Sequence, residues 1–236
     1  FTRHAATSSA PPHALPIVLV HGLGGTQYVW QPIVDALQSH GEVITIDMPG
    51  FGESPSAPEW TLTDAARAIT TTLSQHGVER FVLAGHSLGG GVSIRLATTE
   101  AERVAALALI APAGFAGTSD GSVPAATVAL HAAWRIFVRF GSSPLLRSDS
   151  VRSRVFAPLV HDTSVINASE AATLAHGASL GRSTVAARAE ILAANLTDEL
   201  ADLSMPVELV WGREDRVVLF DYAERVADRI PSVRTS

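Results

Sequence analysis

Residues 80–99 read Arg80-Phe-Val-Leu-Ala-Gly-His-Ser-Leu-Gly-Gly-Gly-Val-Ser-Ile-Arg-Leu-Ala-Thr-Thr99. The apolar run that follows Arg80 is short and ends at Gly85, which favours a buried parallel strand over a half-exposed one. From Leu88 onward the apolar residues recur at helical spacing. The stretch therefore predicts a strand, a tight turn and a helix, with Ser87 in the turn.

The same alternation of strand and helix extends along the chain on both sides of this stretch. Further apolar runs predict strands at Pro16–His21, Glu42–Asp47, Val104–Ile110 and Pro206–Trp211. Helical spacing occurs between them at Tyr28–Ser39 and Thr61–His76, and after the last of them at Leu219–Ile230. The first 14 residues fit a loop. This order predicts an α/β protein with a doubly wound, mostly parallel sheet and helices on both faces.

The alternation stops between two of the predicted strands. Residues 113–204 contain no strand signal, and the segments Pro124–Phe140, Asp149–Val160 and Ser183–Leu203 fit helices. We expect this insertion to form a helical cap over the carboxyl edge of the sheet, and residues 1–112 and 205–236 to form the core.

Composition excludes several classes of function. The formal net charge of −6 argues against a nucleic-acid partner, and no apolar run is long enough to span a membrane. The chain has no cysteine and no lysine, which excludes thiol nucleophiles, thiolate metal sites and Schiff-base chemistry. Serine, histidine and carboxylates remain as candidate catalytic groups, and we expect no metal or organic cofactor.

Four motifs stand at the ends of predicted strands. Gly85-His-Ser-Leu-Gly89 matches the motif G-x-S-x-G. Its glycines allow a sharp turn that exposes the serine. The alternative is a glycine-rich turn that contains a serine without a catalytic role. His21-Gly-Leu-Gly-Gly25 follows a predicted strand, and there the Leu23 N–H and the Leu88 N–H could together stabilise an oxyanion. The alternative is that this segment only leads from the strand into a loop. Asp47–Ser54 fits a structural turn. In Gly212-Arg-Glu-Asp215, Glu214 and Asp215 compete as the carboxylate that would orient an imidazole.

Together these motifs resemble the α/β-hydrolase superfamily, in its branch of capped bacterial esterases and carbon-carbon hydrolases. The resemblance covers about residues 17–230. It implies the α/β-hydrolase fold, Ser87 as nucleophile, Asp215 as the triad acid, and the Leu23 and Leu88 amides as oxyanion hole. A serine rather than an aspartate at the elbow points away from haloalkane dehalogenases and epoxide hydrolases, which need a carboxylate there.

The catalytic histidine is the point at which the sequence departs from the family pattern. The family places it ~25–30 residues beyond the acid, and no histidine follows His176 in this sequence. We expect a longer natural chain with a histidine at about position 240–245, and we expect residues 1–236 alone to be nearly inert. The histidines within the predicted cap, His131, His161 and His176, fit surface or packing positions better than a base.

The sequence thus predicts a cytoplasmic serine hydrolase that cleaves a small carboxylic ester or related acyl compound through a Ser87 acyl-enzyme. Alternatives are carbon-carbon bond hydrolysis, acyl transfer, or a non-catalytic ligand-binding protein that has lost the base. The pattern does not indicate an oligomeric state. An apolar cleft is expected above Ser87, with candidate lining residues Trp134, Phe137, Leu174 and Leu180.

Overall fold

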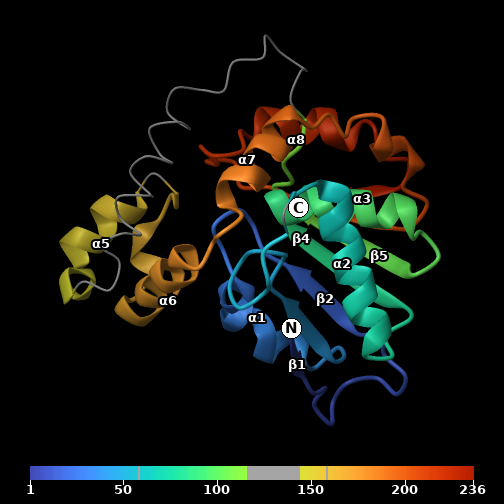
Figure 1. Ribbon diagram of the computed structural model, residues 1–236, viewed down its shortest axis with the longest axis horizontal. Helices are drawn as coiled ribbons and strands as arrows, with labels where there is room; N and C mark the ends of the chain where they lie inside the picture. The colour runs from blue at the N-terminus through green and yellow to red at the C-terminus, as the bar shows by residue number, and fades with distance from the viewer. Residues whose placement is uncertain (58, 116–143, 158) are drawn as a thin grey trace.

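A mostly parallel β-sheet lies at the centre of the molecule, flanked by helices (Figure 1). The computed structural model describes residues 1–57, 59–115, 144–157 and 159–236, and within them the sheet has seven strands in the order β1-β3-β2-β4-β5-β6-β7. The strands are β1 (Thr2–His4), β2 (Ile17–Val20), β3 (Val43–Ile46), β4 (Phe81–His86), β5 (Val104–Ile110), β6 (Val207–Val210) and β7 (Val233–Thr235). All neighbours are parallel except β1 and β3.

Helices follow the strands in the alternating order that the sequence predicts. They are η1 (Gln27–Trp30), α1 (Gln31–Leu37), α2 (Leu62–Gln75), α3 (Leu88–Thr99), η2 (Pro144–Arg147), α5 (Asp149–Phe156), η3 (Thr163–Val165), α6 (Ala168–Ser179), α7 (Thr184–Ala193), η4 (Glu199–Asp202) and α8 (Asp221–Ala227). In the part of the chain that the structure describes, none of them combines the length and the apolarity needed to cross a membrane.

Apolar cores lie on both faces of the sheet, as β2 illustrates. Val18 and Val20 belong to the larger cluster, which α2, α3 and α8 share, whereas Leu19 packs with Trp30 and Val34 on the opposite face. Side chains of a strand alternate between its two faces, so a continuous apolar run fills both cores. The predicted doubly wound α/β class is therefore confirmed.

The N-terminus differs from the sequence prediction. Thr2–His4 form an edge strand rather than a loop, paired antiparallel with β3. The Arg3 side chain also forms a two-point ion pair with Glu42. A three-residue polar strand that relies on backbone pairing gives no hydrophobic pattern for a sequence analysis to detect.

Between β5 and β6 the described residues form helices. The helix predicted at Asp149–Val160 corresponds to α5, and the one predicted at Ser183–Leu203 ends already at Ala193, where the chain turns to pair Asn195 with Phe115. Helix α6 was not predicted. The helix predicted at 124–140 lies outside the described residues.

Two packing environments divide this insertion. An apolar cluster of its own joins η2, α5 and α6 around Phe156 and Ala171, and Arg152 ties it together by donating to the carbonyl oxygens of Leu146 and Ile166. Figure 1 shows α5 and α6 set to one side of the sheet. Ala187 and Ile191 of α7 instead belong to the main core. The division into a core and a cap at residues 112 and 205 stays a prediction.

Candidate active site

Ser87 occupies the turn between β4 and α3, in a backbone conformation that L-residues rarely adopt. Its φ is 52° and its ψ is −116°. The turn is fixed by hydrogen bonds from Ser87 N to the Ile110 carbonyl (3.0 Å) and from Ala113 N to the Ser87 carbonyl (3.0 Å). A strained, over-determined conformation of this kind is what a nucleophile elbow requires, because it lifts the serine above the sheet edge. The predicted turn and its unusual backbone are both present.

Close backbone packing explains the glycine that follows the elbow. A Cβ atom built on Gly89 would lie 2.4 Å from the carbonyl oxygens of both Val20 and His21. The first turn of α3 can therefore approach the end of β2 only if position 89 has no side chain. This contact brings the start of α3 next to the His21–Gly25 loop.

The loop after β2 lies directly beside Ser87. A Cβ atom on Gly22 would be 3.2 Å from the Ser87 Cβ and 2.9 Å from Nδ1 of His86. Neither the Leu23 amide nor the Leu88 amide donates a hydrogen bond within the described residues. The Leu88 amide opens α3, where the helix dipole favours negative charge. Among the described residues, two N–H groups without an acceptor therefore lie in the segments that adjoin Ser87.

The His21 side chain fixes this loop through hydrogen bonds of its two ring nitrogens. Its ring is fully buried, Nε2 accepts a hydrogen bond from Met48 N (3.1 Å), and Nδ1 therefore carries the proton and donates to the Gly22 carbonyl (2.8 Å). Burial lowers the pKa of His21 to about 4, although the Gly22 carbonyl and Asp47 act in the opposite direction. A neutral imidazole at physiological pH is what this hydrogen-bond pattern needs.

Asp47 connects the two loops around His21. Its carboxylate accepts hydrogen bonds from the backbone N–H groups of Gln27 (2.7 Å) and Glu53 (3.3 Å). These hydrogen bonds connect the start of η1 to the turn at residues 47–54. They agree with the prediction that this turn has a structural role. The sequence analysis did not predict that His21 and Gln27 position these loops. For His21, the one signal in the sequence was its place between the end of a strand and Gly22.

Asp215 lies beyond the end of β6, two strands from Ser87. The strands between them run in register, with His86 opposite Ile110 and Ile110 opposite Val210. Strand spacing alone separates the ends of β4 and β6 by ~10 Å, so one imidazole could contact both residues only if their side chains extend toward β5. The Asp215 Oδ1 accepts hydrogen bonds from Val217 N (2.8 Å) and Val218 N (3.0 Å), which fixes the carboxylate.

His86, which precedes Ser87 in the chain, interacts electrostatically with Asp215. The surrounding protein lowers the pKa of His86 by desolvation, and the Asp215 carboxylate partly opposes that effect. His86 nevertheless remains exposed. Asp215 therefore acts on the residue next to Ser87, whereas the competing Glu214 is exposed and has no hydrogen bond or ion pair within the described residues.

The remaining predicted residues lie in the insertion. Leu174 packs into the apolar cluster of α5 and α6, Leu180 is half-buried, and His161 and His176 are exposed. His131, Trp134 and Phe137 lie outside the described residues, so the apolar cleft above Ser87 stays a prediction. The carboxyl end of α6 contacts the loop near Ser87, because a Cβ on Gly177 would lie 2.8 Å from Thr26 Oγ1. Within the described ranges, no group of three or more histidines and carboxylates could hold a metal ion.

Comparison with known proteins identifies the family. Residues 16–236 match the alpha/beta hydrolase fold family. The chain belongs to this family. A pimeloyl-[acyl-carrier protein] methyl ester esterase of Pseudoalteromonas atlantica is 31% identical over 212 residues, which cover 85% of this chain and 76% of the esterase. An enol-lactonase from Burkholderia xenovorans has the same fold, with a TM-score of 0.72, 22% identity, and coverage of 99% of this chain and 86% of the lactonase.

A third relative matches over a shorter region. The dihydrolipoyllysine-residue acetyltransferase component of the acetoin cleaving system of Pseudomonas putida is 39% identical over 107 residues, which are 45% of this chain and 29% of that protein. The chain thus spans under a third of that relative. The hydrolase family that the motifs predicted is confirmed, and the relatives with esterase and acyltransferase names support an enzyme.

The strain at Ser87 predicts an order of stability among variants. Glycine adopts a positive φ without steric cost, whereas alanine retains the strain and loses only the hydroxyl. We expect Ser87→Gly to be more stable than Ser87→Ala by ~1–2 kcal/mol in the free energy of unfolding measured by urea denaturation. A Gly variant less stable than the Ala variant would contradict the strained elbow.

The buried neutral His21 predicts a pH dependence of stability. Because its pKa falls from an ordinary value of 6.5 to about 4 on folding, the unfolded chain binds more protons between these values. The stabilisation is complete above about pH 6.5 and is lost as the pH falls towards 4, by on the order of 3 kcal/mol. The stability difference between the wild type and His21→Asn should therefore shrink over this range, and a constant difference would refute the assignment.

Proposed function

We propose that the protein is a serine hydrolase that cleaves a carboxylic ester or related acyl compound through an acyl-enzyme on Ser87. The substrate is a small molecule, the site needs no metal or organic cofactor, and the proposed compartment is the cytoplasm. The observation that carries the proposal is the position of Ser87 in a strained strand-helix turn. The amides of Leu23 and Leu88, which have no acceptor among the described residues, lie in the segments that adjoin it.

The proposed reaction begins with attack of the Ser87 oxygen on the substrate carbonyl carbon. The hydroxyl proton passes to a base, and the carbonyl electron pair moves onto the oxygen that the Leu23 and Leu88 N–H groups stabilise. Collapse of this intermediate expels the alcohol, which takes the proton from the base. Water then attacks the ester on Ser87 by the same steps and releases the acid.

Asp215 supplies the acid of the proposed triad. With Oδ1 held by two backbone N–H groups, Oδ2 is left to accept the N–H of an imidazole and to stabilise its cation. The proposed base is an imidazole that contacts both Ser87 and Asp215. An imidazole lying over the end of β5 would reach both Ser87 and Asp215, since β5 separates their strands.

Acyl transfer is the second candidate, and the similarity to the P. putida acetyltransferase component favours it. The two reactions share the acyl-enzyme and differ only in whether water or another nucleophile accepts the acyl group. Carbon-carbon bond hydrolysis and a non-catalytic ligand-binding role stay open as predictions.

The proposal predicts the activity of matched variants of the full-length gene product. Ser87→Ala should lower kcat for a short-chain chromogenic ester by about 10⁴–10⁶-fold, and Asp215→Asn by about 10⁴-fold, because each removes one member of the triad. Adding an alcohol to the assay separates hydrolysis from acyl transfer through the products formed.

Two controls are available on the same elements. Ser93 lies on α3 with a buried hydroxyl that lacks a hydrogen bond within the described residues, so Ser93→Ala should leave turnover unchanged. Asp221→Asn removes an exposed carboxylate six residues beyond Asp215 and should be equally neutral. Turnover that persists in Ser87→Ala would refute the proposed nucleophile.

A further inference from the structure

Helix α6 reaches the core beside the loop that carries the Leu23 amide. It contacts η1, and Gly177 of α6 lies against Thr26, the buried residue that precedes η1. A Cβ atom on Gly177 would lie 2.8 Å from Thr26 Oγ1 and 3.0 Å from Thr26 Cγ2. The helix can therefore take this position only if residue 177 has no side chain. Thr26 follows Leu23 closely in the chain, so the seat of α6 belongs to the surroundings of the proposed oxyanion hole.

The segment that joins α6 to α7 is bound to the turn that follows β3. Arg182 donates hydrogen bonds to the Ser54 carbonyl oxygen (2.6 Å) and to Ser56 Oγ (3.1 Å). The backbone N–H of Ser183 donates to the Gly50 carbonyl oxygen (3.1 Å). The Ser183 side chain also fills the space in which a side chain of Gly50 would stand. This segment is therefore attached to the turn by side-chain and backbone contacts together.

The same turn is connected to the Leu23 loop through Asp47. The Asp47 carboxylate accepts hydrogen bonds from Glu53 N in the turn and from Gln27 N, which directly follows Thr26. The contacts thus form a closed ring that runs from the end of α6 through the turn and Asp47 to Thr26 and back to α6. Because closely packed groups transmit displacements to one another, a shift of α6 would move the loop that carries Leu23.

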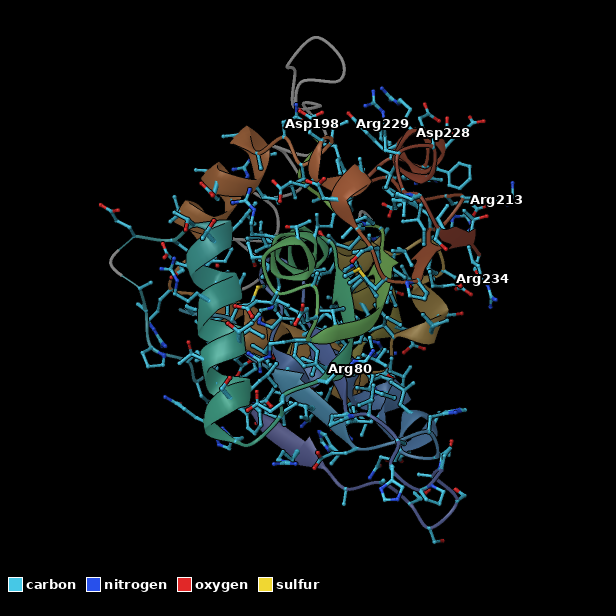
Figure 2. The ribbon with its side chains drawn as sticks, turned by 90° about the vertical axis from the view of Figure 1, so that its right-hand side faces the viewer. Arg80, Asp198, Arg213, Asp228, Arg229 and Arg234 are labelled. Carbon is cyan, nitrogen blue, oxygen red and sulfur yellow. The ribbon has the colours of Figure 1, made fainter. Side chains whose placement is uncertain are left out.

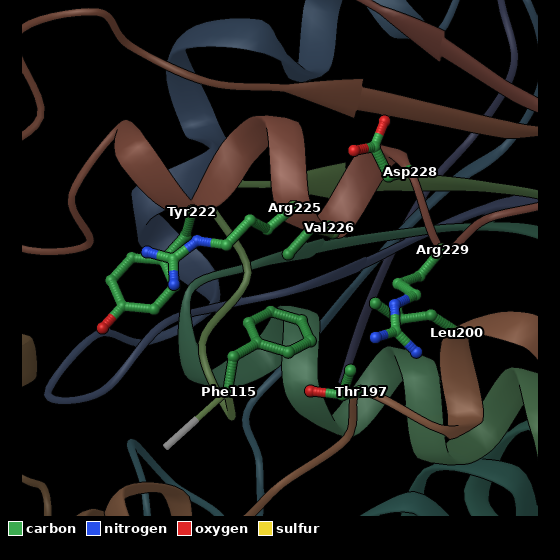
Figure 3. A pocket seen from close by; sticks show the side chains of 8 residues that line it. All are labelled: Phe115, Thr197, Leu200, Tyr222, Arg225, Val226, Asp228 and Arg229. Atoms are coloured by element: carbon green, nitrogen blue, oxygen red, sulfur yellow. The ribbon is translucent and has the colours of Figure 1, made fainter. Parts of the chain in front are cut away.

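The part of the insertion after the α6–α7 segment is held separately by the main core. Ile191 of α7 is buried in that core. The chain beyond α7 pairs with Phe115, whose buried ring faces Val226 of α8 (Figure 3). Figure 2 shows Asp198, further along this chain, at the same end of the molecule as Arg229. Helix α7 therefore gives the α6–α7 segment a fixed end, from which Arg182 can set the position of α6.

We propose that Gly177 and Arg182 are positioning residues for the oxyanion hole, because they seat α6 against Thr26 and thereby fix the Leu23 N–H. This role rests on the proposed reaction at Ser87, in which the oxyanion forms. A hydrogen bond to the oxyanion is stronger in the transition state than in the bound substrate, so a displaced Leu23 amide lowers kcat and leaves KM nearly unchanged. A helix that only bound the substrate would change KM instead.

The first test is Gly177→Ala in the full-length gene product, assayed for kcat and KM with the short-chain chromogenic ester. We expect kcat to fall about tenfold, which is less than the ~10²–10³-fold cost of losing an oxyanion donor, and KM to stay within about twofold. Ala172→Ser is the matched control, since it adds one atom at an exposed position of the same helix. This control should turn over as the wild type does.

A compensating substitution tests the contact itself. Thr26→Ala removes the two atoms that the new methyl group would meet, and the Thr26 Cβ that remains is 3.5 Å away, an ordinary contact distance. The Thr26 side chain makes no capping hydrogen bond to η1, so alanine is acceptable at this position. The double variant Gly177→Ala/Thr26→Ala should therefore recover kcat to within about threefold of the wild type.

The second test is a series at Arg182. Arg182→Gln should lower kcat about fivefold, and Arg182→Lys should lower it less, because a lysine can still donate to the Ser54 carbonyl. Arg154→Gln is the control, since Arg154 is an exposed arginine of α5 without a hydrogen bond or ion pair among the described residues. Its kcat should equal that of the wild type.

Urea denaturation of every variant separates displacement of the loop from loss of the fold. Unchanged kcat in Gly177→Ala, a change confined to KM, or a loss that Thr26→Ala does not restore would overturn the positioning role and leave that of Ser87 intact. If Gly177→Ala does not fold, unchanged kcat in Arg182→Gln overturns the proposal. Turnover that persists in Ser87→Ala would instead refute the proposed function, and the positioning role with it.

Discussion

The backbone of Ser87, held at a φ of 52°, is the constraint on which the rest of the site depends. A residue in this region of conformational space must be fixed by its surroundings, and here the end of β5, the first turn of α3 and the loop after β2 all contribute. Strand β4 lies between β2 and β5 near the middle of the sheet, so neighbouring strands support the elbow on both sides. The packing of the two apolar cores on either face of the sheet offsets the free-energy cost of this strain.

Buried polar groups complete the frame around the elbow. His21 is neutral and uses both ring nitrogens, one towards Gly22 and one towards Met48, so the loop that carries Leu23 is fixed by directional bonds rather than by packing alone. Asp47 joins the same loop to the 47–54 turn through backbone N–H groups. Burial of these polar groups costs little because each has hydrogen-bond partners. Together they fix the loop that carries the Leu23 amide, which donates to no other group in the part of the chain that the structure describes.

The strands and helices of the core could be predicted from sequence because each has a strong hydrophobic period, as at Phe81–Ala84 and in α2. The G-x-S-x-G turn could be placed because its neighbours are a strand and a helix. Strand β1 and helix α6 were missed, since the first is three polar residues and the second is rich in alanine without a clear apolar face. The role of His21 was missed because hydrogen bonds between distant loops leave no periodic signal.

The most direct test of the central claim is a crystal structure of the full-length protein after reaction with an aryl phosphonate, which mimics the tetrahedral intermediate. The account predicts a covalent bond from phosphorus to Ser87 Oγ, with the phosphoryl oxygen ~2.7–3.1 Å from the backbone nitrogens of both Leu23 and Leu88. An adduct on another residue, or a phosphoryl oxygen directed away from these two amides, would contradict it.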